Sequence, residues 1–168
     1  MENEMKRKIW LTSDNHFNHA NIIRYCNRPF SSVDEMDDFM ISKWNEKVSK
    51  EDIVIHLGDF ALAGEDKIKK LRSKLNGTII LIKGNHDWRV KENYGFIIVK
   101  GILQINNFLL THKPLPAEEI PQGFVNIHGH VHQKESLTGI NVSVEKTDYE
   151  PIELENILKK QFQNMKGG

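Results

Sequence analysis

Cysteine is nearly absent from this sequence, because Cys26 is the only one among 168 residues. A single cysteine excludes an internal disulfide and any multi-cysteine zinc site, and it is typical of a reducing, cytoplasmic setting. Long apolar runs are missing too, since no stretch approaches the roughly 20 residues of a membrane span. Residues 1–8 lack the apolar core of a secretion signal. We therefore expect a cytoplasmic protein without a membrane partner.

An excess of either charge is also missing. Lys and Arg number 23, as do Asp and Glu, so the net charge gives no reason to expect a long nucleic acid as partner. Composition therefore does not favour nucleic acid, although it leaves that alternative open. A chain of 168 residues, 39% of them hydrophobic, fits one core, and we expect a single domain over residues 1–168.

Histidine, in contrast, is abundant, with eight residues in the chain. Seven of them lie within a few residues of an apolar run or a glycine: His16, His56, His86, His112, His128, His130 and His132. This placement is the main clue that the composition gives to a functional site.

Apolar segments and helical patterns alternate in the first half of the chain. Short apolar runs predict strands at residues 9–11, 53–55 and 79–82. The capping-box pair Ser32 and Glu35 predicts the start of an amphipathic helix, and residues 64–75 predict another. Residues 18–25 predict a helical turn or two. This order favours parallel strands joined by helical crossovers, as in an α/β protein.

The second half has a different pattern. Short strands joined by short turns are predicted at residues 96–99, 102–105, 108–111, 125–127 and 140–144. Such a meander suggests a second sheet packed on the first. A terminal helix is predicted for residues 154–165, with one apolar side formed by Leu154, Ile157, Leu158, Phe162 and Met165. Core packing accounts for all the apolar stripes, so no oligomeric state is predicted.

Polar blocks follow the predicted strands directly. They are Asp14-Asn15-His16, Gly58-Asp59, Gly84-Asn85-His86-Asp87, Thr111-His112 and Gly129-His130-Val131-His132. Ligands bind at the carboxyl ends of strands in open α/β sheets, so we expect these blocks to meet at one edge. If their segment is extended, Asp14 and His16 share one face.

The side chains in these blocks are typical of metal ligands. Oxygen and nitrogen donors without thiolates suit Mn²⁺, Fe, Ni²⁺ or Zn²⁺. The set is too large for one tetrahedral ion and about right for two ions that share one carboxylate. Two divalent ions carry four positive charges, whereas Asp14 and Asp59 supply two negative ones. The difference favours an anionic substrate such as a phosphate ester.

The ordered set of blocks from Asp14 to His132 resembles the calcineurin-like metallophosphoesterase superfamily, in particular its small stand-alone bacterial and phage members. The resemblance implies an α/β (α+β) fold: a sandwich of two mixed sheets flanked by helices, in four layers. It also implies hydrolysis of a phosphodiester or nucleotide-like phosphoester by a hydroxide that bridges two divalent ions. Mn²⁺ is the expected metal, with Fe, Ni²⁺ or Zn²⁺ as alternatives, and a small phosphoester or nucleotide is the expected substrate.

The resemblance also implies a role for each residue. The first metal would be held by Asp14, His16, Asp59 and His132, with Asp59 bridging to a second metal held by Asn85, His112 and His130. His86 would be an acid that binds no metal, and Asp87 would orient it.

Several alternatives stay open. The enzyme could be a nuclease acting on nucleic-acid ends, although the sequence lacks an aromatic and basic strip, or the chain could be a catalytically silent binding scaffold. Arg28 and His19 are candidate substrate contacts, and a surface salt bridge is an equal alternative for Arg28. His56 is predicted to be a buried, hydrogen-bonded histidine that either belongs to the core or supports the ligands, and His128 is predicted to support the ligands without binding metal.

Two smaller predictions concern the surroundings of the site. The segment 112–123 contains three prolines and should form a stiff loop over the site without an ordered element. Cys26 is predicted to be a small apolar filler, because no pattern that stabilises a thiolate surrounds it.

Overall fold

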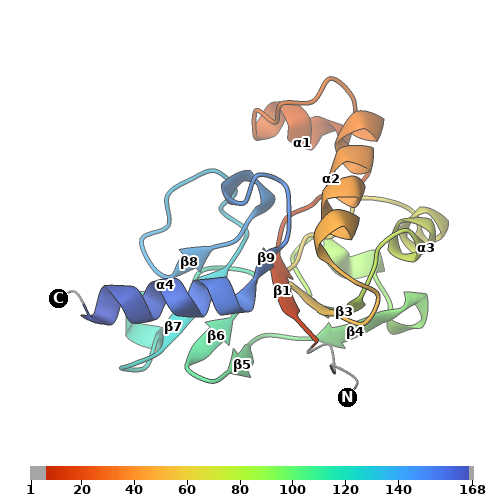
Figure 1. The fold of residues 1–168 in the computed structure, drawn as a ribbon. Helices are drawn as coiled ribbons and strands as arrows, with labels where there is room; N and C mark the ends of the chain where they lie inside the picture. Colours follow the sequence, from red (N-terminus) through yellow and green to blue (C-terminus); the bar gives the residue numbers. More distant parts are fainter. Residues whose placement is uncertain (1–6, 167–168) are drawn as a thin grey trace, which may run out of the picture.

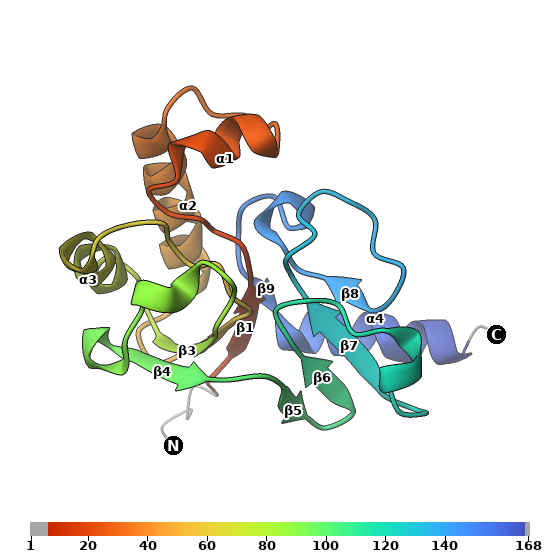
Figure 2. The ribbon, with the colours of Figure 1, turned by 180° about the vertical axis from the view of Figure 1, so that it is seen from behind.

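The computed structural model describes the backbone of residues 7–166 and the side chains of residues 7–160. Two mixed β-sheets form the centre of the molecule, with helices on the outside (Figures 1 and 2). This arrangement confirms the predicted fold class. Among the residues described, no helix combines the length and the apolar character needed to cross a bilayer.

The first sheet contains five strands in the order β4-β3-β2-β1-β9. Their bounds are β1 Ile9–Thr12, β2 Ile53–His56, β3 Thr78–Ile82, β4 Phe96–Val99 and β9 Ile152–Glu153. Strands β1 to β4 run parallel, and β9 pairs antiparallel with β1. The predicted parallel pairing of the first three strands is therefore confirmed, because the helices between them return the chain to the same end of the sheet.

Strand β4 corrects one prediction, since it belongs to the first sheet and not to the later meander. Two short 3₁₀ helices, Asp87–Arg89 and Glu92–Tyr94, lie between β3 and β4. They act as a crossover that lets β4 pair parallel with β3. The sequence between the strands has no long helical period, which is why this crossover was missed.

The second sheet has the order β5-β6-β7-β8. Its strands are β5 Leu103–Ile105, β6 Phe108–Leu110, β7 Val125–His128 and β8 Ile140–Asn141. Only β5 and β6 form an antiparallel hairpin, whereas β6, β7 and β8 are parallel. The meander prediction is wrong here, because the loops after β6 and β7 carry the chain back before the next strand begins.

Strand β8 is also shorter than the predicted strand 140–144. The Val142 amide still donates a hydrogen bond to the His128 carbonyl in the second sheet. The Val144 amide, in contrast, donates to the carbonyl of Ser13. The chain thus crosses from the second sheet to the end of β1. It continues in a short 3₁₀ helix, Val144–Lys146.

The described residues form four α-helices: α1 Ala20–Tyr25, α2 Val33–Lys47, α3 Glu65–Ser73 and α4 Leu154–Lys166. The capping box is confirmed in part at α2: the Ser32 hydroxyl accepts a hydrogen bond from the Glu35 amide at 3.1 Å, but the Glu35 carboxylate accepts from the Ser31 amide, one residue before the N-cap. Helix α3 is shorter than predicted, since Gly64 is its N-cap. The predicted apolar positions Phe162 and Met165, and the C-terminal glycines 167–168, lie outside the described side chains.

Alternating residues of the first sheet build two hydrophobic cores. Val54 and Ile79 face α2 and α3, where Trp44 is fully buried. Their neighbours on the opposite face, such as Leu11 and Ile55, pack against the second sheet and α4 in a second cluster. The period of two is that of a strand buried on both faces. The helices α2 and α3 and the second sheet accordingly lie on opposite sides of the first sheet (Figures 1 and 2).

A buried carboxylate connects the edge of this core to β1. The two oxygens of Asp52 accept hydrogen bonds from the Lys8 amide at 3.0 Å, the Trp10 indole at 3.0 Å and the Ser49 amide at 2.9 Å. Burial opposes ionisation of Asp52, but these hydrogen bonds outweigh it and lower its pKa. Its contribution to stability is therefore present above its unfolded-state pKa and is lost as the pH falls through the folded value.

We expect Asp52→Ala to lower the free energy of unfolding at pH 7 by about 3 kcal/mol, because three donors lose a charged acceptor. Urea unfolding followed by circular dichroism measures this change. Asp66→Ala is the matched control, since the Asp66 side chain on α3 is fully exposed. A loss below 1 kcal/mol for Asp52→Ala would contradict the structural role assigned to this carboxylate.

Candidate metal centre

The predicted ligands all follow the carboxyl ends of parallel strands. Asp14 and His16 come after β1, Asp59 after β2 and Asn85 after β3. In the second sheet, the remaining three histidines follow β6 and β7: His112, His130 and His132. The structure gathers six of these seven side chains into two groups of possible metal donors.

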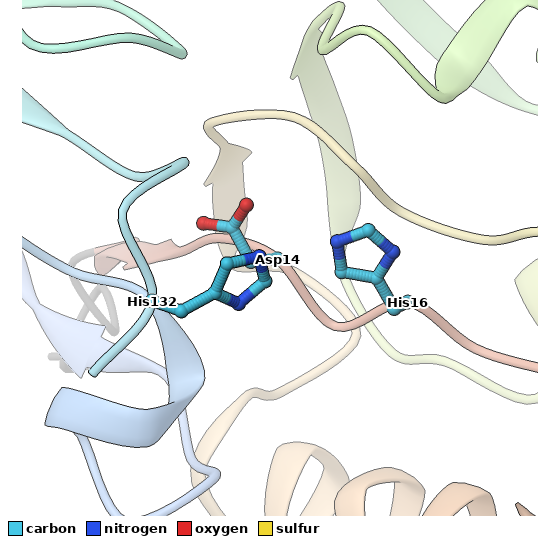
Figure 3. A group of neighbouring side chains, drawn as sticks. All are labelled: Asp14, His16 and His132. Atoms are coloured by element: carbon cyan, nitrogen blue, oxygen red, sulfur yellow. The ribbon is translucent and has the colours of Figure 1, made fainter. Parts of the chain in front are cut away.

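The first group consists of Asp14, His16 and His132, whose donor atoms lie within 4.8 Å of one another. Figure 3 shows that two segments supply them, one carrying Asp14 and His16 and the other carrying His132. Asp14 Oδ2 accepts hydrogen bonds from the Ser143 hydroxyl at 2.9 Å and the His130 amide at 2.8 Å.

Two buried atoms of this group have no hydrogen-bond partner among the described residues: Asp14 Oδ1 and His16 Nε2. Burial raises the pKa of Asp14, although the nearby His112 and His132 oppose this effect. Burial also lowers the pKa of His16 well below its usual value, so its ring is held neutral. Buried acceptors without partners are costly in a protein interior, and a cation removes that cost. The first group therefore fits a metal ion.

The second group consists of Asp59, His112 and His130, again with donor atoms within 4.8 Å. His112 Nδ1 lies 2.8 Å from the Leu57 carbonyl oxygen, which can only accept, so Nδ1 carries the proton. His112 Nε2 then presents a lone pair, and Asn85 Oδ1 lies 3.0 Å from it. Two acceptors at this distance fit a cation between them, and the bond behind the ring fixes its orientation.

Asp59 lies between the two groups. Its Oδ2 atom is 3.4 Å from His16 Nε2 and 3.5 Å from His112 Nε2, so one carboxylate oxygen faces a histidine of each group. Its other oxygen, Oδ1, accepts a hydrogen bond from the His86 amide at 2.9 Å. This placement is what a carboxylate shared by two ions requires.

The backbone at these ligands corrects one prediction. Asp14 and His16 have φ values of 59° and 50°, so their segment is not extended and the shared-face argument fails. Their amides instead bond to the carbonyls of Gly58 and Asp59 at 2.9 and 3.0 Å. The same left-handed conformation recurs at Asp59, His130 and His132, so five of the predicted ligands have a positive φ.

Asp87 has a different role from the one predicted. Its Oδ2 atom accepts hydrogen bonds from the amides of Asp59 at 2.7 Å and Gly84 at 2.8 Å, and its Oδ1 from Phe60 at 2.8 Å. With both oxygens turned to these amides, the carboxylate holds the β2 and β3 loops together and does not orient the His86 ring. Burial raises the pKa of Asp87, opposed by these amides.

His86 and His19 lie at the solvent side of the donors. The His86 side chain is 39% exposed, and its Nε2 atom is 3.9 Å from Asp59 Oδ2. His19 Nδ1 lies 3.3 Å from His16 Nδ1, and the His19 and His86 ring centroids are 6.3 Å apart. Burial lowers the pKa of His19, helped by the nearby His86. Both rings therefore border the space in front of the donors.

Arg28 forms the salt bridge considered for it, with Glu145, but the pair is buried and does not lie at the surface. Its guanidinium donates to the carbonyls of Asn15 at 2.8 Å and Asp14 at 2.7 Å. It also donates twice to Glu145, at 2.9 and 2.7 Å, and once to the Met36 sulfur. These five bonds occupy all five N–H groups, which leaves none for a substrate phosphate. Arg28 instead holds the backbone that carries Asp14.

Glu145 contacts the predicted site, although the sequence alone did not single it out. Besides Arg28, its Oε1 atom lies 3.0 Å from His132 Nδ1. Burial alone would lower the pKa of His132, but its hydrogen bonds to Cys26 and Glu145, together with the charge of Asp14, raise that pKa to about 10. No motif marks Glu145, which reaches Arg28 across 117 positions of sequence.

Three other polar residues surround the ligands. His56 is fully buried, as predicted, with Nε2 2.9 Å from Asn15 Oδ1, and burial lowers its pKa to about 3. His128 is also buried, and its Nδ1 lies 2.9 Å from the Gly129 oxygen. Cys26 is buried but is not a purely apolar filler, because its sulfur lies within 4.8 Å of donor atoms of His132 and Glu145.

Two clefts open beside the donors. One, of about 420 Å³, is lined by Asn85 and His112 together with Lys83 and Lys113. The other, of about 370 Å³, includes His130 and His132 among its lining residues. The segment 112–123, with its three prolines, contributes Lys113 and Leu115 to the first cleft. It contains a short 3₁₀ helix at Ala117–Glu119, whereas no ordered element was predicted there.

The sequence matches the calcineurin-like phosphoesterase family over residues 7–167. The chain belongs to this family. The resemblance recognised in the polar blocks is thereby confirmed, and with it a general phosphoesterase character. Members of this calcineurin-like family typically bind divalent metals, and the two donor groups are candidate sites for them.

Several known proteins are similar to this calcineurin-like phosphoesterase. An uncharacterized protein of Methanocaldococcus jannaschii is 43% identical over 165 residues, covering 91% of this chain and 90% of the relative. The gene 66 protein of Mycobacterium phage D29 is 27% identical over 163 residues, covering 75% of this chain and 79% of its own length.

Two solved structures are also similar. A protein of unknown function from Aquifex aeolicus aligns with a TM-score of 0.73 at 27% identity, covering 92% of this chain and 99% of its own. The nuclease MPE of Pseudomonas putida aligns with a TM-score of 0.52 at 22% identity, covering 75% of this chain and 62% of its own. At that identity the second likeness supports the fold alone.

Proposed function

We propose that this protein is a dinuclear metal-dependent phosphoesterase that hydrolyses small phosphodiesters. The observation that carries the proposal is the position of Asp59 Oδ2, 3.4 Å from His16 and 3.5 Å from His112. One carboxylate oxygen thus faces both donor groups, as two ions sharing a ligand would need. Among candidate metals, Mn²⁺ suits these oxygen and nitrogen donors.

The residues of each proposed metal site follow from the donor groups. Asp14, His16 and His132 would hold one ion, and His112, His130 and Asn85 the other, with Asp59 between them. When bound, divalent ions supply the positive charge that activates water and neutralises phosphate oxygens.

The two clefts support a diester in preference to a monoester. A phosphate bound at the donor groups would lie next to two clefts. One is lined by Asn85 and His112, and the other by His130 and His132. A phosphodiester has two organic substituents and can use both clefts, whereas a monoester can fill only one. Lys83 and Lys113 would add positive charge near the phosphate.

His86 is the residue that we assign to substrate. Its partly exposed ring lies near Asp59 and has its centroid 5.1 Å from that of His16. It is absent from both donor groups, so it can donate a proton or hydrogen bond to a phosphoryl or leaving-group oxygen.

The test is metal content by mass spectrometry of the purified protein, followed by hydrolysis of bis-p-nitrophenyl phosphate and p-nitrophenyl phosphate after Mn²⁺ reconstitution. We expect about two metals per chain and faster turnover of the diester. Two metals per chain with turnover of neither ester would favour the alternative that the protein is a catalytically silent binding scaffold. An absence of metal would contradict the proposal that the two donor groups are metal sites.

His86→Ala should retain the metal but lower kcat by about 10²- to 10⁴-fold, because general acid assistance contributes that much. The comparison of metal content and kcat on the same sample separates the two effects. Lys159→Ala, on the exposed side of α4, is the control variant and should change neither the metal content nor kcat. Loss of metal with an unchanged rate per bound metal would show that the role of His86 is wrong.

A further inference from the structure

An exposed aromatic ring borders one of the two clefts. Tyr25, at the end of α1, is 62% exposed and lines the 370 Å³ cleft together with His130 and His132. Its ring centroid lies 6.3 Å from that of His19, which in turn borders His86. A large aromatic side chain with this exposure next to a polar site has no role in the core.

The other lining residues make this cleft suitable for a flat, partly polar group. Ile22 and Val131 supply apolar surface, and Gln133 and Lys134 are exposed at its rim. A glutamine amide offers both donors and acceptors, which match the edges of a nucleobase. The volume of about 370 Å³ lies within the usual range for small-ligand sites.

We propose that this cleft binds the base of a nucleoside phosphodiester, with the base stacked on Tyr25 and the phosphate at the candidate metal centre. The proposal rests on the phosphoesterase function proposed above and narrows its substrate class. The equal numbers of acidic and basic residues favour a small nucleoside ester over a long strand, whose binding depends on an excess of positive charge. Aromatic stacking tolerates any base, so no base preference is required.

A second exposed aromatic residue provides an internal comparison. Trp88 follows the His86-Asp87 block and is 65% exposed, but the Arg89 guanidinium lies 4.2 Å from its ring centroid. One face of Trp88 is thus already covered by a cation. Arg24 lies farther from the Tyr25 ring, at 5.6 Å. Tyr25 is the better stacking surface and Trp88 is a suitable control.

The first experiment compares two diesters that share one leaving group: thymidine 5′-(4-nitrophenyl phosphate) and ethyl 4-nitrophenyl phosphate. The wild-type protein should prefer the nucleoside ester in kcat/KM. Tyr25→Ala should reduce this preference about 10-fold, within the range that stacking contributes per base. Tyr25→Phe should restore it, and Trp88→Ala should leave it intact. A preference unchanged within twofold in Tyr25→Ala, or lost in Trp88→Ala instead, would overturn the proposal.

The second experiment does not depend on turnover. Calorimetric titration of the Mn²⁺-loaded protein with thymidine 5′-monophosphate and with inorganic phosphate measures the base contribution directly. Tighter binding of the nucleotide that is lost in Tyr25→Ala supports the base site even if neither ester is hydrolysed, in which case only the proposed catalytic function fails. Equal binding of nucleotide and phosphate by the wild-type protein would overturn the base site while leaving the phosphoesterase proposal in place.

Discussion

Asp59→Asn is expected to remove most of the bound metal and to lower phosphodiester turnover by more than about 100-fold. This loss should exceed the roughly 10- to 100-fold effect of changing a residue that only hydrogen-bonds to a metal ligand. The substitution removes the negative charge that lies between His16 and His112. It keeps a side-chain oxygen that can accept the hydrogen bond from the His86 amide. Asparagine also tolerates the left-handed backbone at this position, where φ is 56°. The fold should therefore survive while the ions are lost.

Metal per chain, kcat/KM for bis-p-nitrophenyl phosphate and the urea midpoint should be measured on the same preparation of Asp59→Asn. Asp66→Asn makes the same chemical change on the exposed face of α3 and should alter none of the three values. Two metals per chain and an undiminished rate in Asp59→Asn would exclude a shared carboxylate. A collapsed urea midpoint would show instead that Asp59 is needed mainly for folding.

Gly129→Ala is expected to destabilise the fold and to weaken metal binding together. A Cβ atom at Gly129 would overlap the Ser13 hydroxyl and Asp14 Oδ2, so the loop after β7 can approach the end of β1 only without a side chain. The loop must move away, and the bond from the His130 amide to Asp14 must lengthen. We expect a loss of about 3 kcal/mol in unfolding free energy, together with weaker metal binding.

Urea unfolding and metal titration of Gly129→Ala measure these two effects. The matched control is Gly64→Ala, because a Cβ atom there meets nothing within 4 Å and the backbone has an ordinary φ of −70°. Its cost should stay below about 1 kcal/mol. A similar loss in both variants would mean that the close approach at Gly129 does not limit stability or metal binding.

The sequence predicts the three central strands β1, β2 and β3 of the first sheet and the polar blocks that follow them, because both depend on local patterns. Apolar runs followed by polar blocks identify parallel strand ends, and such ends meet at one edge for topological reasons. The second sheet was harder, since turn length alone does not show that β6 and β7 pair in parallel. The two 3₁₀ helices before β4 have too few residues to leave a helical period.

The support around the donors could not be predicted in the same way. Arg28, Glu145 and Ser143 reach the ligands from positions far away in the sequence, and nothing local distinguishes them from surface residues. Asp87 shows the opposite problem, because its block is recognisable but its bonds go to backbone amides. Predicting the residue types at a site is therefore easier than predicting which groups each one contacts.

The left-handed backbone at five of the predicted ligands has a consequence for engineering. Each such residue is less favourable than glycine would be, by an amount on the order of 1 kcal/mol. Glycine would remove this backbone cost at each position, but it would also remove a donor of the proposed centre and, at Asp14 and Asp59, the acceptor of the hydrogen bonds from the His130 and His86 amides. A thermostable form that keeps its ligands should be sought with metal present and with turnover as the selected property.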